Sequence, residues 1–187
     1  GGHYRLDKTK LSMDAGWRME VQGLQSIEMS VEMSDVDTQT LSQGAPPQMN
    51  LAGFRLAVDV SPAFGQQALK ACALGTDLTV DEWSDRYAEQ FIAGLAAEGL
   101  SLGSGLQRAV RDFYREWGTI EVVAAPAEPV GLLSLAFLPP NRLADALSLR
   151  LIVNDKLVTD TRFTWDRENG PALSALFDTE PEEATTT

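Results

Sequence analysis

The chain has 187 residues, of which 44% are hydrophobic and 22% are charged, a composition typical of an ordinary globular protein. Its 15 basic and 27 acidic residues give a net charge of −12, which disfavours nucleic acid and anionic membrane surfaces as partners. The chain has one cysteine and one histidine. Zinc sites and most nucleophile–base pairs need several such side chains together, so these site classes are also disfavoured.

The length predicts a single domain, which we place over residues 1–177. Residues 178–187 carry four acidic side chains without a basic partner, and this pattern predicts a disordered acidic tail. No apolar run is long enough to cross a bilayer, so we expect no transmembrane segment in this chain. The chain begins with Gly1 rather than Met, so we expect a cleaved signal peptide, a removed anchor or a cloning remnant upstream.

The first third of the sequence predicts antiparallel strands. Apolar and polar residues alternate with a period of two, which gives each strand one apolar face and one solvent-exposed polar face. The pattern covers residues 17–22, 27–34 and 54–60, with a weaker candidate over 4–13. The segment 38–48 contains glycine and two prolines and predicts a loop. His3 falls in what we expect to be a loose, exposed N-terminal tail.

The middle third predicts three helices. Their expected boundaries are Ser61 and Gly75, Thr79 and Gly99, and Ser104 and Gly118. Thr79 and Glu82 have the spacing of a capping box, and residues 99–105 predict a helix–helix connection. Cys72 shares a predicted apolar face with Phe64, Ala68 and Leu69, so we expect a buried and inert thiol.

The last third returns to strands, beginning with residues 120–126. Residues 130–138 are strongly apolar and predict either a buried strand or a helical turn, and Pro139-Pro140 opens a short helix. Residues 149–153 and the stretch from 157 onward predict a hairpin with Phe163 and Trp165 on the inner face of its second arm.

Separate strand-rich and helix-rich segments predict an α+β fold. We expect a twisted antiparallel sheet of about six to seven strands with three to four helices packed on one face.

Five aromatic residues lie on the second and third predicted helices: Trp83, Tyr87, Phe91, Phe113 and Trp117. They either pack in the core or line an apolar pocket between the helices and the sheet.

Three arginines on the third predicted helix form its basic face: Arg108, Arg111 and Arg115. They either pair with neighbouring acidic residues or contact a carboxylate or phosphate. The pair Asp35 and Asp37 is too sparse for a calcium loop. We predict no catalytic residue, no cofactor and no metal ligand.

One stretch resembles a known group of proteins. The residues Gly118-Thr119-Ile120-Glu121-Val122, then 126–130, a short helix and 151–154 resemble uncharacterised exported proteobacterial proteins, over about residues 104–155. The resemblance implies a periplasmic or envelope-associated location after removal of a signal peptide, and it carries no activity or site. A single cysteine fits either redox compartment, so a cytoplasmic location stays open.

The sequence therefore predicts a non-catalytic module of the bacterial envelope that binds a protein partner or gives structural support. The alternative is a carrier of a small apolar ligand, such as a lipid or acyl chain, held between helices and sheet. A hydrolase is the third hypothesis.

Overall fold

The computed structural model of the chain describes residues 1–7, 11–36 and 49–166. The predicted loop over 38–48 and the predicted tail over 178–187 lie outside these residues, as do Asp37 and the last part of the expected domain. The strands are β1 (Gly2–Asp7), β2 (Ser12–Val21), β3 (Gln25–Ser34), β4 (Asn50–Val60), β5 (Leu100–Leu102), β6 (Gly118–Ala124), β7 (Val130–Gly131), β8 (Arg150–Val153), β9 (Lys156–Leu157) and β10 (Phe163–Trp165). The helices are α2 (Pro62–Ala73), α3 (Val80–Ala97), α4 (Ser104–Glu116), α5 (Leu132–Phe137) and α6 (Pro140–Ala146).

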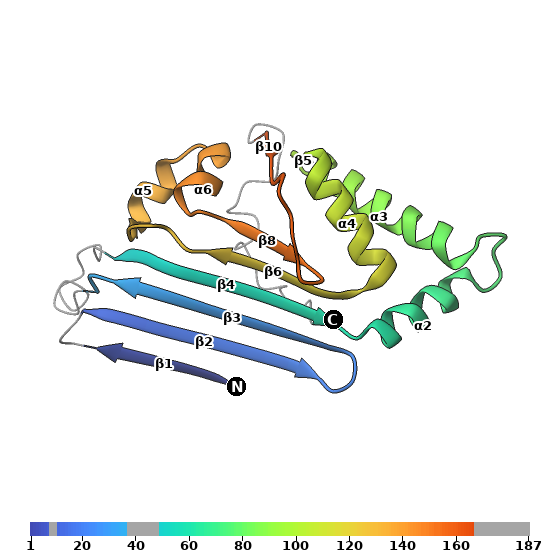
Figure 1. Ribbon diagram of the computed structural model, residues 1–187, viewed down its shortest axis with the longest axis horizontal. Coiled ribbons are helices and arrows are strands. Elements are labelled where there is room, and N and C mark those ends of the chain that lie inside the picture. Colours follow the sequence, from blue (N-terminus) through green and yellow to red (C-terminus); the bar gives the residue numbers. More distant parts are fainter. Residues whose placement is uncertain (8–10, 37–48, 167–187) are drawn as a thin grey trace, which may run out of the picture.

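The predicted α+β fold is confirmed. One sheet of eight strands has the order β1-β2-β3-β4-β6-β8-β9, with β7 paired to β4, and all of its pairings are antiparallel (Figure 1). A second sheet contains β5 and β10. None of the helices in the described part of the chain is long and apolar enough to span a membrane.

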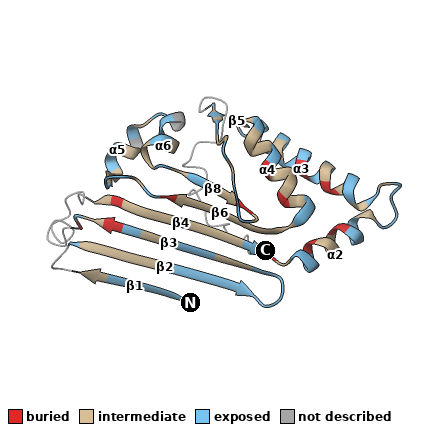
Figure 2. Cartoon of the chain, in the orientation of Figure 1, coloured by how far each residue is buried: buried red, intermediate tan, exposed pale blue. Residues whose placement is uncertain are grey.

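The helices cover only one part of the large sheet. In Figure 1 α3, α4, α5 and α6 lie on the β6–β8 side and α2 lies beyond the end of β4, while β1 and β2 extend away from them. The core cluster joins Ala109 and Phe113 of α4 to Val60 of β4 and Val153 of β8. No residue of β1 or β2 is buried, as Figure 2 shows. The main core cluster therefore sits under α4, and further buried residues (Met33, Leu51 and Ala124) lie towards the other end of the strands.

Local signals place the long helices where the sequence predicts them. The Thr79 hydroxyl accepts the Glu82 backbone N–H at 3.3 Å, and the Glu82 carboxylate accepts the Thr79 backbone N–H at 2.8 Å. This reciprocal capping box satisfies two N–H groups that a helix start otherwise leaves unpaired. The Thr79 backbone N–H and the Thr79 hydroxyl, which donates to the same carboxylate at 2.7 Å, together hold the pKa of Glu82 below its usual value.

The expected burial of Cys72 is wrong, because the thiol is exposed. The buried residues of α2 are Gly65 and Leu69, so the contacted face includes Leu69 of the predicted apolar set but not Phe64 or Cys72.

The predicted loose tail at His3 is also wrong. His3 lies in β1, opposite Gly16, and its Nε2 is 3.3 Å from Oδ1 of Asp14. Backbone pairing with β2 orders this segment although its side chains, among them Tyr4 at 80% exposure, bury little surface.

The predicted C-terminal hairpin is correct only in its first turn. β8 pairs with β9, but Phe163 and Trp165 pair with Leu102 and Leu100 of β5. The expected helix–helix connection over 99–105 therefore contains a strand, whose partner lies about 60 residues later. The apolar run over 130–138 divides into the short strand β7 and helix α5.

Candidate functional site

One face of the large sheet is lined almost entirely by apolar side chains. Residues directly opposite each other on neighbouring strands project to the same face, so the register defines rows that run across the sheet. Three such rows are Tyr4–Ala15–Val31–Phe54–Ala124, Trp17–Met29–Leu56–Val122–Leu151 and Met19–Ile27–Val58–Ile120–Val153. We call the surface formed by these rows the apolar face.

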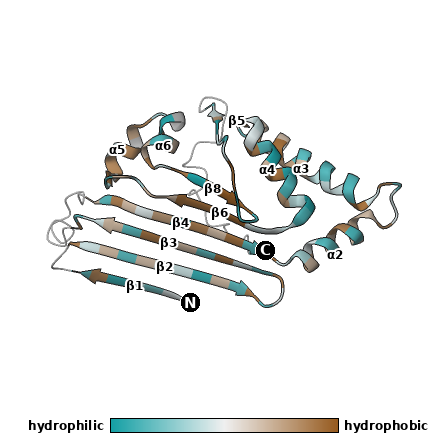
Figure 3. Ribbon diagram, in the orientation of Figure 1, coloured by the Kyte–Doolittle hydropathy of each residue, from teal (hydrophilic) through white to brown (hydrophobic). Residues whose placement is uncertain are grey.

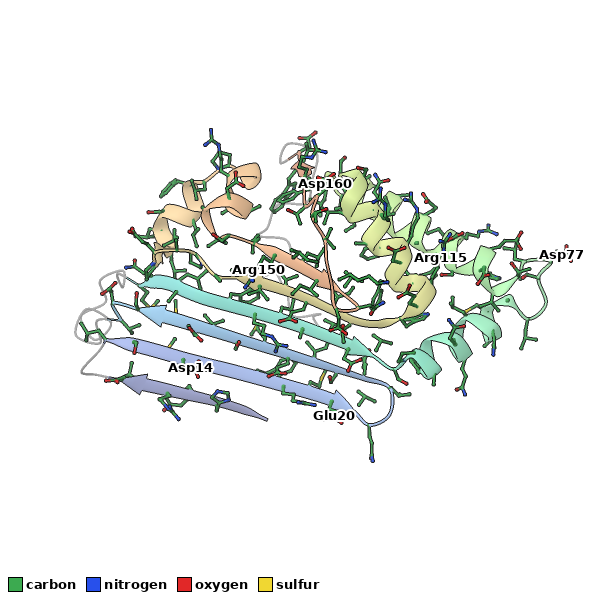
Figure 4. The ribbon with its side chains drawn as sticks, viewed as in Figure 1. Asp14, Glu20, Asp77, Arg115, Arg150 and Asp160 are labelled. Carbon is green, nitrogen blue, oxygen red and sulfur yellow. The ribbon has the colours of Figure 1, made fainter. Side chains whose placement is uncertain are left out.

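The opposite face is polar. Arg55 lies near its centre, with Nε 2.7 Å from Glu121 and Nη1 3.5 Å from Glu28 on the two neighbouring strands. The hydrogen bond to Glu121 is the main cause that raises the pKa of Arg55. Figure 4 labels Asp14, Glu20 and Arg150 among the charged residues of the sheet. The two faces thus differ sharply in what they can bind.

Methionine is concentrated on the apolar face. Four of the five methionines of the chain lie there: Met13, Met19, Met29 and Met33. Unbranched, polarizable methionine side chains adapt to irregular apolar partners and are frequent at adaptable binding surfaces. Met19 and Met29 are the exposed members of this set, whereas Met33 is buried and Met13 is half-buried, so two adaptable side chains are open to a partner.

Coverage of the apolar face decreases from β8 towards β2. Val153 is 5% exposed under α4, whereas Trp17 and Met29 are 43% and 38% exposed. Met19 and Val21, each 41% exposed, extend the uncovered part along β2. Nothing in the described part of the chain covers this half of the face.

An apolar pocket of about 200 Å³ lies at the covered end of the face. Its lining comes from α3, β5 and α4 on one side and from β6 and β8 on the other, and it consists of Phe91, Leu95, Leu102, Leu106, Ala109, Val110, Ile120, Leu151 and Val153. No side chain in this set carries a charge or a hydrogen-bonding group. Figure 3 shows the strongly hydrophobic character of β6 and β8, which form the pocket floor.

The five predicted aromatic residues are distributed over several environments. Phe113 is buried against the sheet, while Tyr87 and Phe91 are 47% and 44% exposed. Only Phe91 belongs to the pocket lining described above. Tyr87 and Phe91 contact Tyr114 edge to face, with ring centroids 5.1 Å and 6.0 Å apart.

Tyr114 connects these aromatic residues, because its ring also contacts Phe113 and Trp117. Burial raises the pKa of its hydroxyl above the usual value. Trp83 lies apart, where its indole N–H donates to the Thr76 hydroxyl at 3.0 Å. The aromatic group therefore fixes α4 against α3 and only touches the pocket.

The three predicted arginines do not converge on one point. Arg115 of α4, labelled in Figure 4, forms two hydrogen bonds of 2.8 Å and 2.9 Å with the Asp85 carboxylate of α3. Arg111, also on α4, pairs with Glu89 of α3 at 2.7 Å. Arg108 instead lines a polar hollow on another side of α4. Two of the three guanidinium groups thus join α4 to α3.

That polar hollow has a volume of about 180 Å³ and contains Ser104 and Asp160. The Ser104 hydroxyl donates to Asp160 at 3.3 Å, and Arg162 donates to the same carboxylate at 2.8 Å. The bond from Arg162 is the main reason that the pKa of Asp160 is lowered. A carboxylate held ionised by Arg162 is a poor general base, because a base needs a pKa near the working pH.

The described residues contain no group of three or more His, Cys, Asp or Glu side chains placed to hold a metal ion. Asp35, which the sequence raised as a weak calcium candidate, accepts a hydrogen bond of 2.6 Å from the Asn50 side chain.

Sequence reasoning missed the aliphatic lining of the pocket and the methionine-rich half of the apolar face. The alternation in residues 17–22 and 27–34 predicts strands, but it does not show which apolar faces the helices leave uncovered. The position of Met29 between Trp17 and Leu56 in one row becomes evident only from the register.

Comparisons with known proteins give a family but no characterised relative. A family model with the description "Uncharacterized protein" matches residues 18–154. No curated protein and no solved structure matches the chain. The matched segment covers well over half of the chain, and it includes β3, β4, the three long helices and β6. The chain therefore belongs to this family of uncharacterized proteins.

Proposed function

We propose that this protein is a non-catalytic binding module that holds an acyl chain in the apolar pocket between α3, α4 and the sheet. The observation that supports this proposal is that the apolar floor of the pocket continues across the sheet without an intervening polar side chain. Leu151 in the pocket is followed across the sheet by Val122, Leu56 and Met29. An acyl chain is the ligand class that needs a long apolar path and no hydrogen-bond partner.

The dimensions support this ligand class. A fully apolar cavity of about 150 Å³ is large enough for a benzene-sized guest, and this pocket has about 200 Å³. Neighbouring strands are about 4.8 Å apart, so the path from β8 to β3 adds roughly 14 Å. One end of a fatty acid would occupy the pocket while the rest lies along the row.

Two additives distinguish a free fatty acid from a membrane lipid as the source of the acyl chain. They are palmitate, and vesicles of phosphatidylethanolamine and phosphatidylglycerol. A ligand present at 100 times its Kd stabilises a protein by about 2.7 kcal/mol. For a chain of this size, this corresponds to a Tm increase of roughly 5–10 °C. We expect a saturable increase in Tm with one or both additives, measured by differential scanning fluorimetry. Native mass spectrometry of the protein purified from cells would show the mass of a co-purifying lipid.

A pocket-filling variant locates the binding site. Val110→Trp adds volume to the pocket from α4 and should abolish the shift while leaving the unliganded protein folded. The matched control is Leu133→Trp on α5, where the side chain is 61% exposed and outside the pocket. An equal shift in wild type and Val110→Trp, or no saturable shift in wild type, would contradict the proposal.

A second candidate function, binding of a protein partner or structural support, is favoured by the uncovered half of the apolar face. Large exposed apolar patches on a folded chain commonly mark interaction sites. A photoreactive amino acid at Trp17 should then crosslink a protein in cells, whereas the same group at Arg18, on the polar face, should not. Equal crosslinking from both positions would reject this function.

We also place the protein in the bacterial envelope, with the periplasm as its compartment. The support is the resemblance of residues 104–155 to exported proteobacterial proteins. Expression of the natural gene with its own upstream sequence, followed by osmotic-shock fractionation, tests the location. Recovery with cytoplasmic markers would reject it.

A further inference from the structure

We infer that the polar hollow beside α4 binds a small zwitterion, with a free aliphatic α-amino acid as the expected ligand. Arg108 holds the carboxylate of this ligand, and Asp112 holds its ammonium group. The hollow shares Ala109 and Val153 with the apolar pocket, but none of its charged residues belongs to the lining of that pocket. The inference therefore goes beyond the proposed acyl-chain function and does not depend on it.

The hollow lies between α4 and residues 153–160, and its volume is about 180 Å³. A cavity of about 150 Å³ is large enough for benzene, so the hollow has room for an amino acid of the size of leucine. Five of the described residues that line it are charged: Arg108, Asp112, Glu116, Lys156 and Asp160.

Three of these five charged residues are already paired within the chain. The Glu116 carboxylate lies 3.5 Å from the ammonium group of Lys156. Asp160, which Figure 4 labels, accepts hydrogen bonds from Ser104 and Arg162. These contacts compensate three of the charges inside the hollow, so one cation and one anion remain.

The two remaining charges belong to Arg108 and Asp112, which form no hydrogen bond or ion pair with another described residue. Asp112 acts at a distance on Arg115, but that guanidinium group is bound to Asp85. Residues four positions apart on a helix share one side, with Cβ atoms about 5–6 Å apart. The sequence left an anion contact open for the three arginines of α4, and Arg108 is the one that the structure leaves unpaired.

An α-amino acid carries the complementary pair of charges. Its carboxylate can accept parallel hydrogen bonds from a guanidinium group, and its ammonium group can donate to a carboxylate. A purely anionic ligand would place a second negative charge beside Asp112, and a purely cationic ligand would place a second positive charge beside Arg108. The pair therefore favours a zwitterion over a ligand with a single charge.

The wall opposite α4 favours an aliphatic side chain on the ligand. This wall includes Val153, Leu157 and Val158. A ligand side chain that contacts these residues leaves water, which stabilises the complex if the side chain is aliphatic and costs hydration if it is polar. The net charge of −12 also opposes an acidic ligand. We therefore expect the hollow to prefer leucine, isoleucine or valine.

Isothermal titration calorimetry of the intact protein with L-leucine tests the inference. We expect saturable binding of leucine. The affinity should fall roughly tenfold or more for N-acetyl-leucine, which lacks the ammonium group, and for leucinamide, which lacks the carboxylate. Equal affinity for leucine and either derivative would overturn the inference.

Glycerophosphoethanolamine distinguishes a lipid head group from a free amino acid, because it carries the same pair of charges on a phosphate and an ammonium group. Binding of this compound in place of leucine, lost in both Arg108→Gln and Asp112→Asn, would support the zwitterion site and assign it to a lipid. No saturable binding of either compound would overturn the inference.

Arg108→Gln and Asp112→Asn locate the site. Each variant removes one of the two charges and should weaken leucine binding by roughly tenfold or more. The matched controls are Arg142→Gln and Asp145→Asn, because both residues are exposed on α6 and lie outside the hollow. Circular dichroism establishes that each variant is folded. Leucine affinity that is unchanged in Arg108→Gln or Asp112→Asn, or equally reduced in the controls, would overturn the inference.

Discussion

The indole ring of Trp117 lies directly against the backbone of Gly65, so that α2 meets the end of α4 without an intervening side chain. A Cβ atom placed on Gly65 would overlap the Trp117 ring. Gly65 and Leu69 are the buried residues of α2. This contact explains why a glycine is present inside a helix, where it costs about 0.5–1 kcal/mol relative to alanine.

Gly65→Ala should therefore destabilise the protein although alanine is the better helix former. Overpacking a filled contact costs about 1–3 kcal/mol, which exceeds the gain in helix propensity. The matched control is Gly94→Ala in α3, where a Cβ meets nothing within 4 Å. That variant should stabilise by about 0.5–1 kcal/mol. Urea unfolding followed by circular dichroism measures both, and a stabilised Gly65→Ala would show that the Trp117 contact is not fixed.

Phe91 and Phe113 should respond differently to truncation. Phe113 is 7% exposed, so Phe113→Ala should cost about 3–5 kcal/mol, as core truncations do. Phe91 is 44% exposed, so Phe91→Ala should cost only about 1–2 kcal/mol while weakening the Tm shift that palmitate produces. Equal destabilisation by the two substitutions, measured by chemical unfolding, would place Phe91 in the core instead.

The ion pair between Asp85 and Arg115 should make the α3–α4 contact sensitive to acid. The hydrogen bond from Arg115 lowers the pKa of Asp85 below its usual 3.8 in the folded protein. A group with a lowered folded pKa stabilises the protein above its unfolded pKa, and this contribution disappears as the pH falls through the folded value. Asp85→Asn should thus lower Tm at pH 7 but have a smaller effect near pH 3.

The size of that effect is limited, because the Asp85 side chain is 42% exposed and solvent weakens exposed ion pairs. Thermal unfolding of both proteins between pH 7 and pH 3 measures it. Asp77→Asn, in the connection before α3, serves as the control and should show no convergence with wild type. A difference for Asp85→Asn that is constant with pH would refute the role of the ion pair.

Cys72 should react rapidly with a thiol reagent in the native protein, because it is exposed near the end of α2. Cys72→Ala should change the free energy of unfolding by less than about 0.5 kcal/mol, as expected for an exposed position. Labelling with a chromogenic disulfide in buffer and in denaturant compares the two rates. A native rate slowed by orders of magnitude would indicate that the thiol is protected.

The sequence predicted those features that depend on local patterns. The alternation around Met29 identified β3, and the Thr79–Glu82 pair identified the start of α3, because both signals operate within a few residues. The pairing of Leu102 with Phe163 has no local signal, since each segment has only three residues. The same limit explains Cys72: its apolar neighbours showed that α2 has an apolar side, but the contact between Gly65 and Trp117 decides which side is buried.

The candidate site was predicted only in outline. A pocket between helices and sheet was one of the two interpretations of the aromatic residues, and the observed pocket contains Phe91 but otherwise aliphatic side chains. Aliphatic residues such as Val110 occur throughout any core, so the sequence did not mark them. The sequence predicts the basic residues of α4. The different surroundings of its arginines, which are Asp85, Glu89 and the polar hollow, depend on the packing of α4 against α3.

The strand β10 lies beyond residues 18–154, the segment that the family model matches. Its end is tied to the end of α3 by a bond of 2.8 Å from the Asp166 N–H to the Gly99 carbonyl, and the Gly103 N–H reaches the Arg162 carbonyl at the same distance. A fragment that stops at residue 154 would break both bonds and expose β5 as an unpaired edge, a site where other chains add and aggregate. Truncations and fusions should therefore keep the chain intact through Asp166, because the folding unit is longer than the segment that the family model matches.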